Sequence, residues 1–327
     1  MANCHKLFIE FNEAIMLVDS KKEILRKSRD LLRDDIRSYF KKEQPDEILP
    51  KFHGQGSYRM HTIVTPIADE DGNLEYDIDD GIYFIGGETD RKDVNTYHNW
   101  IYSAVKGRTK KETDKTTCVR VIYADGHHID LPMYFIINGN CPELAHKNAG
   151  WVKSDPREFY QWFNNKAKAD GQLRRIVRYF KAWCDKRNND NSAIEMPPGV
   201  IMTILTANNH SPNERDDISF KNTMQSIYDN LQLNFVCYRP TTPTNEDLFA
   251  GFSETQKKGI LKNIYSFLTS ANQAIENPNQ KDACHKWQKH FGNRFSCSNA
   301  KDEIEDSNKY KSPAVISSSA KSGIVCL

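Results

Sequence analysis

The stretch "YDIDDGIYF", residues 76 to 84, decides the fold. Its apolar residues predict a β-strand, although Asp has a low strand propensity and carboxylates on one face repel each other. Residues two apart in a strand point to the same face, with their Cα atoms roughly 7 Å apart. Asp77 and Asp79 therefore share a face, whereas Asp80 points the other way and packs or hydrogen-bonds behind it. Two carboxylates side by side need a stabilising partner, and a divalent cation is the usual one.

Composition narrows the class of protein. The chain has 327 residues, enough for two lobes, and its 38% hydrophobic and 27% charged residues are typical of a soluble globular protein. No apolar run reaches the roughly 18 residues that span a bilayer, and charges interrupt the apolar N-terminus, which therefore does not resemble a signal peptide. The net charge of +1 gives no strong attraction to nucleic acid or anionic membranes. We therefore expect a cytoplasmic protein that binds no membrane and no nucleic acid stably.

The cysteines agree with that compartment. There are eight, scattered along the chain without a CxxC pair. In a chain of this length they predict reduced thiols and neither a zinc site nor a disulfide framework.

Hydrophobic periodicity divides the chain into two parts. Residues 20 to 43 have helical spacing under a Ser20 cap, with apolar positions at Ile24, Leu31, Leu32, Ile36 and Phe40. Strand patterns follow, with a hairpin that turns near Asp125-Gly126. After Pro156 the patterns are helical, notably over 199–209, 216–231 and 253–276. We expect a mixed lobe over 1–154 that includes the long N-terminal helix, a helical lobe over 155–298, and a polar, mobile tail over 299–327.

A third carboxylate and a turn complete a candidate site. Asp130, in "HHIDLPMYF", is placed on a strand next to Asp77 and Asp79. Three such carboxylates can hold two magnesium ions roughly 4 Å apart, which is the arrangement for in-line phosphoryl transfer. The Gly56-Ser57 turn offers backbone N–H groups and a hydroxyl to a triphosphate, and glycine allows close approach of the backbone. Each part alone has an ordinary explanation as a loop, a solvated strand edge or a turn cap, but together they favour a nucleotidyltransferase.

Two histidines stand beside the third aspartate. Because adjacent side chains in a strand point to opposite faces, His127 and His128 cannot join one zinc site. At the end of a hairpin, we expect both to lie at the surface.

Several motifs in fixed order carry a resemblance to a known family. "GQGSY", "DIDDG" and "HIDLPMY" resemble the bacterial cGAS/DncV-like nucleotidyltransferases, and most of all the DncV-type cyclic dinucleotide synthases of anti-phage (CBASS) systems. "WVKSDPREFYQWFN", "LRRIVRYFKAWCDKR" and "FGNRF" extend the likeness over roughly residues 50 to 295. The resemblance implies an α+β fold, in which a polymerase-β-like nucleotidyltransferase core is fused to a helical lobe and the active site lies in the cleft between them.

The resemblance also implies roles for single residues. The implied ligands of two Mg²⁺ ions, which Mn²⁺ can replace, are Asp77, Asp79 and Asp130. The implied nucleotide-binding residues are Gly56 and Ser57 at the donor triphosphate, Arg120 near the bases and Lys181 at a phosphate. Met60 departs from the pattern, because such synthases carry a tyrosine near the base at this position.

The family likeness implies synthesis of a signalling molecule. The expected product is a purine-containing cyclic dinucleotide such as 3′,3′-cyclic GMP-AMP, made from ATP and GTP, which would activate a downstream effector in anti-phage defence. Regulatory or conjugating proteins are expected to act on the C-terminal tail, although "SGIVCL" lacks the usual small terminal residue. Three alternatives remain open: a template-independent nucleotidyltransferase that modifies RNA or protein, a cyclic trinucleotide synthase, and a non-catalytic nucleotide-binding module.

Overall fold

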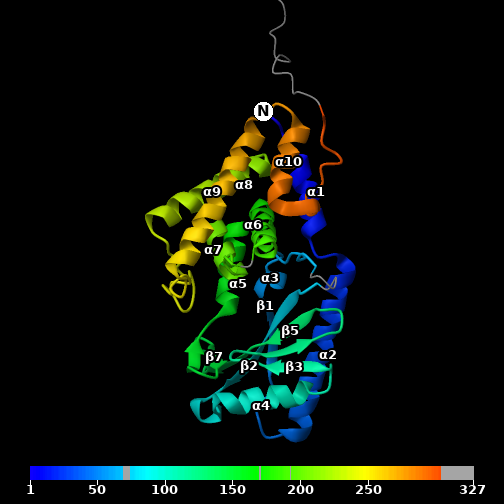
Figure 1. The fold of residues 1–327 in the computed structure, drawn as a ribbon. Coiled ribbons are helices and arrows are strands. Elements are labelled where there is room, and N and C mark those ends of the chain that lie inside the picture. The colour runs from blue at the N-terminus through cyan, green and yellow to red at the C-terminus, as the bar shows by residue number, and fades with distance from the viewer. Residues whose placement is uncertain (69–73, 169–170, 192, 303–327) are drawn as a thin grey trace, which may run out of the picture.

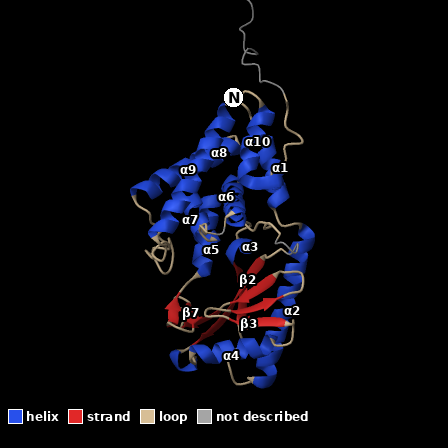
Figure 2. Ribbon diagram, viewed as in Figure 1, coloured by secondary structure: helices blue, strands red, loops and turns tan. Residues whose placement is uncertain are grey.

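The computed structural model describes residues 1–68, 74–168, 171–191 and 193–302. A mixed β-sheet lies at one end of the molecule with helices α2 and α4 against it, and most of the other helices gather at the opposite end (Figures 1 and 2). This arrangement confirms the predicted α+β class.

The helices and strands are bounded as follows. The helices are α1 His5–Ile15, α2 Asp19–Glu43, α3 Gly56–Arg59, α4 Val94–Val105, α5 Pro156–Ala167, α6 Gln172–Asp190, α7 Gly199–Asn209, α8 Asp216–Leu233, α9 Glu254–Glu276 and α10 Gln280–Phe291. The strands are β1 Lys51–Gln55, β2 Asp77–Gly86, β3 Lys111–Asp114, β4 Val119–Ile122, β5 His128–Leu131, β6 Met133–Ile137, β7 Glu143–His146 and β8 Gly150–Lys153.

Strand β2 is the centre of the sheet. It pairs antiparallel with β1 and parallel with both β5 and β6. Strands β5 and β6 run one after the other along β2, and the Ile82 N–H donates to the Pro132 carbonyl at 2.8 Å where they meet. Strands β4 and β3 extend the sheet from β5, and β7 and β8 extend it from β6. Both edges of β2 are therefore paired, and its side chains are held by backbone hydrogen bonds on either side.

The N-terminal helix α1 packs away from the sheet. Its buried residues belong to the core formed by α6 to α10, where the ring of Phe8 lies 5.1 Å from that of Tyr179 and 5.0 Å from that of Trp287. The prediction that residues 1–154 form one lobe therefore does not hold for α1. An amphipathic pattern predicts that a helix has a buried face but does not specify which core covers it.

Helix α2 covers the sheet with a face that differs from the predicted one. Leu32, Ile36 and Phe40 are fully buried, as predicted, but Ile24 and Leu31 are 43% and 50% exposed. One residue further along, a helical side chain turns by about 100°, and Leu25 takes the buried position in place of Ile24. The helix begins at Asp19, and its N-cap residue is Val18, so the predicted Ser20 cap is also wrong.

Two cysteines are paired, which corrects the prediction of reduced thiols throughout. Cys284 in α10 forms a disulfide with Cys297, and their Cα atoms are 5.8 Å apart. The 3₁₀ turn Gly292–Arg294 reverses the chain after α10 and brings residue 297 back beside the helix. The spacing of the cysteines in the sequence did not reveal this pair, because the pairing depends on the reversal of the chain at this turn.

The mobile tail predicted over 299–327 lies outside the described residues from 303 onwards. Within the part that the structure describes, none of the helices combines the length and the apolar character that crossing a bilayer requires.

Candidate active site

The two faces of β2 separate the aspartates as predicted. Asp77 and Asp79 face a cavity, whereas Asp80 is fully buried on the other face. Arg33 of α2 donates to both oxygens of Asp80, from Nε at 2.7 Å and from Nη2 at 2.5 Å. This confirms that Asp80 hydrogen-bonds behind the cavity face, and the pair anchors β2 to α2.

Strand β5 brings the third aspartate beside the first two. In the parallel register Asp79 is paired with Asp130 and Asp77 is paired with His128. Carboxylate oxygens of Asp77 and Asp130 and a ring nitrogen of His128 all lie within 4.8 Å of one another. Carboxylate oxygens are the ligands that hard divalent cations such as Mg²⁺ prefer, so the donor set fits the metal that the family implies.

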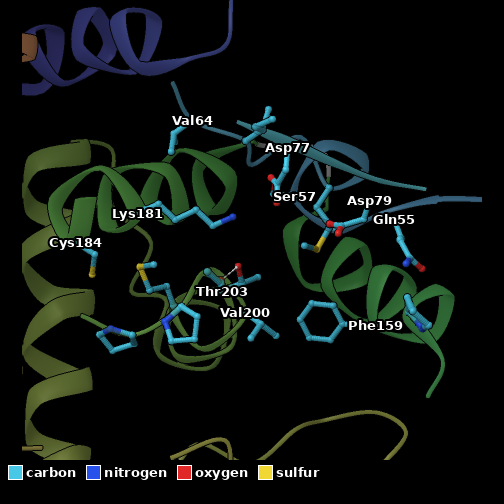
Figure 3. A pocket seen from close by; sticks show the side chains of 18 of the residues that line it. Gln55, Ser57, Val64, Asp77, Asp79, Phe159, Lys181, Cys184, Val200 and Thr203 are labelled. Carbon is cyan, nitrogen blue, oxygen red and sulfur yellow. Dashed lines mark hydrogen bonds between the residues drawn. The ribbon is translucent and has the colours of Figure 1, made fainter. Parts of the chain in front are cut away.

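The carboxylate of Asp79 lies over the Gly-Ser turn. A Cβ atom added to Gly56 would lie only 2.0 Å from Asp79 Oδ2, and Gly56 has φ +68°. Both the close approach and the left-handed backbone require glycine here. Ser57 follows immediately in α3, and Figure 3 shows its side chain between those of Asp77 and Asp79.

Burial and like charges make this group of carboxylates unfavourable without a cation. Desolvation raises the pKa of Asp79, and the charges of Asp77 and Asp130 raise it further. Arg120 and Lys181 act in the opposite direction. A bound divalent cation would relieve the repulsion between the carboxylates and so stabilise the aspartates crowded on β2.

Lys181 of α6 enters the cavity from the helical side. Its Nζ donates to the carbonyl and to the hydroxyl oxygen of Thr62, both at 3.3 Å. Burial lowers the pKa of the ammonium to about 8, although Asp77 and Asp79 favour its charged form. The side chain extends toward Asp77 in Figure 3. It is therefore a buried cation that faces the carboxylates across the cavity.

The cavity between the sheet and the helices has a volume of about 610 Å³. Five predicted site residues line it, namely Gly56, Ser57, Asp77, Asp79 and Lys181. The other wall comes from α5, α7 and the loop after α8, and includes Phe159, Tyr160, Gly199, Thr203, Arg239 and Thr241. Met60, noted for its departure from the family pattern, also lines the cavity and is 5% exposed.

Arg120 is held away from the cavity lining by Asp130. The two residues are paired in the antiparallel β4–β5 register, and Arg120 donates from Nε and Nη2 to the two Asp130 oxygens, both at 2.6 Å. A contact between Arg120 and a base, as the family likeness implies, would require it to give up part of this pair.

The two histidines are buried, so the prediction that they lie at the surface is wrong. His127 is 2% exposed and binds Asp125 and Ser28, while His128 is 9% exposed and faces Asp77 and Asp130. They do point to opposite faces, as predicted. His128 lies two residues before Asp130, so the alternation that paired Asp77 with Asp79 was the signal that could have identified it.

Comparisons with known proteins relate the chain to cyclic GMP-AMP synthases. Residues 50–134 match the family model described as "Cyclic GMP-AMP synthase DncV-like, nucleotidyltransferase domain". A cyclic GMP-AMP synthase of Escherichia albertii is 30% identical over 205 residues, which cover 60% of this chain and 45% of that protein. One from Vibrio cholerae serotype O1 is 25% identical over 340 residues, 86% of this chain and 74% of the relative. The chain thus spans less than half of the first relative and about three quarters of the second.

Solved structures show the same fold. Vibrio cholerae DncV cyclic AMP-GMP synthase in complex with nonhydrolyzable GTP has a TM-score of 0.76 at 21% identity, over 90% of this chain and 97% of that chain. The same protein in complex with the linear intermediate 5′ pppA(3′,5′)pG has a TM-score of 0.74 at 20% identity. Residues 50–134 thus carry a DncV-like nucleotidyltransferase domain, and the fold of DncV extends over 90% of the chain.

Proposed function

We propose that the protein joins nucleoside triphosphates into a cyclic dinucleotide and releases pyrophosphate. The observation that carries the proposal is that Asp77 and Asp79 line the cavity beside the Gly56-Ser57 turn, with Asp130 next to them as the strand partner of Asp79. Its volume of about 610 Å³ falls within the roughly 300–1,000 Å³ typical of small-molecule sites.

The three aspartates would hold two Mg²⁺ ions, which Mn²⁺ can replace. When bound, the ions supply Lewis-acid stabilisation of the charge that develops on the phosphoryl oxygens. The protein's own contribution is position: pairing of β2 with β1 and β5 holds the carboxylates in place before any nucleotide binds.

The remaining predicted residues orient the triphosphate. The backbone N–H groups of the turn and the Ser57 hydroxyl bind its oxygens, because such a turn forms an anion-binding concavity. Lys181 supplies a positive charge from the opposite wall. Binding of a triphosphate would raise the lowered pKa of Lys181 again, since a nearby anion favours the charged form of the ammonium.

Cyclisation requires two transfers at one set of carboxylates. A hydroxyl of the second nucleotide attacks the α-phosphate of the first, pyrophosphate leaves, and the linear product then turns so that the roles reverse. The wall formed by α5 and α7 bounds the space in which both nucleotides stack, and Phe159 and Tyr160 offer aromatic surface to them.

The product that we propose is 3′,3′-cyclic GMP-AMP, made from ATP and GTP. Support comes from the relatives of Escherichia albertii and Vibrio cholerae, which are cyclic GMP-AMP synthases. Arg120 would read guanine after release from Asp130, because a guanidinium donates two hydrogen bonds to the O6/N7 edge of guanine. The biological role that we propose is anti-phage signalling through an effector that the product activates.

The test is incubation of the pure protein with labelled nucleoside triphosphates and Mg²⁺ in the absence of primer. We expect a phosphatase-resistant small product that mass spectrometry identifies, and no product from Asp77→Ala or Asp79→Ala proteins that remain folded. Extension seen only with added RNA would replace the proposal with a polymer-modifying transferase. Robust product from UTP and CTP alone would overturn the purine assignment and leave the cyclase in place.

A further inference from the structure

We propose that His128 is a nitrogen ligand of the cation held by Asp77 and Asp130, and that it makes this position favour Mn²⁺ over Mg²⁺. The inference rests on the proposed function in so far as a divalent cation occupies the site. It adds a ligand to the three aspartates and, with it, a preference among metals.

Backbone pairing places the imidazole at the site. His128 is the first residue of β5 and is the parallel partner of Asp77, while Asp130 follows two residues later on the same face. One ligand atom from each of the three residues lies within 4.8 Å of the others. The position of His128 thus follows from the same register that places the carboxylates.

The imidazole of His128 is buried by the strands on either side of β5 but is not paired by them. The residue is only 9% exposed, yet within the described ranges of the chain its ring has no hydrogen-bond partner. Buried polar groups are normally paired. The neighbouring His127 follows that rule, with one ring nitrogen bound to Asp125 and the other to Ser28. His128 instead presents its ring to the carboxylates of Asp77 and Asp130, as a third ligand of one cation would.

Arg120 does not prevent this use of Asp130. A carboxylate has about four lone-pair positions, and the two hydrogen bonds from Arg120 occupy only two of them. The nearby guanidinium nevertheless weakens the attraction for a cation. An imidazole that binds in its neutral form adds a metal–ligand bond without adding charge.

The chemistry of the ligand set determines which ion it favours. Mg²⁺ prefers oxygen ligands in near-ideal octahedral geometry and keeps much of its water. Carboxylates suit both Mg²⁺ and Mn²⁺, whereas imidazole suits transition metals such as iron, nickel and zinc. Relative to Mg²⁺, an added imidazole therefore shifts the preference of the site toward Mn²⁺. The expected consequence is a preference for Mn²⁺ that three carboxylates alone would not produce.

The experiment measures metal binding by the full chain with Mn²⁺ alone and without nucleotide. Pulsed electron paramagnetic resonance of the wild-type protein should show coupling of Mn²⁺ to a ¹⁴N nucleus. In His128→Leu that coupling should disappear and Mn²⁺ affinity should fall by about ten-fold or more, the scale for loss of groups that tune a metal site. Mg²⁺ affinity, measured by competition, should change far less. His53→Leu, on the exposed side of β1, is the matched control and should keep both the coupling and the affinity.

Two results would overturn the inference. One is a wild-type Mn²⁺ spectrum without nitrogen coupling, which needs no variant and so does not depend on whether His128→Leu folds. The other is an equal loss of Mn²⁺ and Mg²⁺ affinity in folded His128→Leu. Failure of the proposed function would look different, because no cyclic product would form with either metal whatever the spectrum shows.

Discussion

Replacing Gly56 by alanine tests whether the Gly-Ser turn positions the carboxylate of Asp79. The backbone at Gly56 has φ +68°, and a left-handed conformation costs roughly 1–2 kcal/mol for a residue with a Cβ atom. The added Cβ would also lie 2.0 Å from Asp79 Oδ2 and 3.0 Å from its Cγ. Since non-bonded heavy atoms are comfortable at about 3.5–4.0 Å, either Asp79 or the turn must move by about 1 Å or more.

We expect this displacement to lower the rate of product formation by about 100-fold, the scale of a 1 Å misplacement at a reacting centre. The free energy of unfolding should fall by only about 1–2 kcal/mol, the backbone contribution. The assays are pyrophosphate release at saturating ATP and GTP, and urea denaturation. Gly54→Ala is the matched control, because a Cβ atom there meets nothing within 4 Å. A near-wild-type rate for Gly56→Ala, or equal losses in the two variants, would refute the reasoning.

Metal affinity separates two explanations for a slow Gly56→Ala enzyme. If the substitution displaces Asp79, Mn²⁺ should bind more weakly even without nucleotide. If it only blocks the approach of phosphate to the backbone, Mn²⁺ affinity should be unchanged. The contact between the two residues predicts the first outcome.

Four further variants probe other parts of the structure. Ser57→Ala should raise KM for ATP by an amount equivalent to about 1.5–3 kcal/mol, the value of a hydrogen bond to a charged group. Lys181→Met should lose product formation but be more stable at pH 7, by up to about 3 kcal/mol, because burial lowers the pKa of Lys181 to about 8. The folded wild type binds fewer protons than the unfolded chain above that pKa, so its stability should rise relative to the variant between about pH 8 and 10. Arg33→Met should cost roughly 3–5 kcal/mol by leaving Asp80 buried and unpaired, and Cys297→Ser should lower Tm through the loss of a cross-link worth up to about 3 kcal/mol.

Each of these expectations has an outcome that contradicts it. An unchanged KM would show that Ser57 does not contact the triphosphate, and parallel pH–stability curves would show that Lys181 is not a buried cation. Arg26→Met removes an exposed arginine from the same helix and should hardly change the free energy of unfolding. A loss of stability as large as that of Arg33→Met would show that burial of the Arg33–Asp80 pair is not the cause. Cys141→Ser replaces a free thiol and should leave Tm unchanged, whereas a shift like that of Cys297→Ser would point to packing and not to the cross-link.

The features that could be predicted from the sequence are those set by local periodicity. The alternation of β2 was enough to place Asp77 and Asp79 together and Asp80 behind them. The 3.6-residue repeat was enough to delimit α7, which spans 199–209 as expected. Both patterns, the strand alternation and the helical repeat, involve residues close together in the chain, so they can be recognised in a single sequence.

The features that were missed depend on which distant segments meet. The burial of His128 follows from the position of β5 between β4 and β2, and the pairing of Arg120 with Asp130 follows from the β4–β5 register. The attachment of α1 to the helical core follows from contacts such as that of Phe8 with Trp287. None of these partners is specified by the spacing of residues within the segment itself.

The parallel pairing of residues 77–79 with residues 128–130 has a consequence for how the protein is made. Contacts between segments so far apart in the chain form slowly, because the intervening loop must close before the pairing can stabilise it. On the ribosome, the chain therefore emerges with its adjacent carboxylates long before strand β5 has been synthesised. During that interval the nascent protein carries Asp77 and Asp79 without Asp130 beside them. The proposed metal site is therefore complete only after β5 has paired with β2, so metal binding would report closure of the sheet.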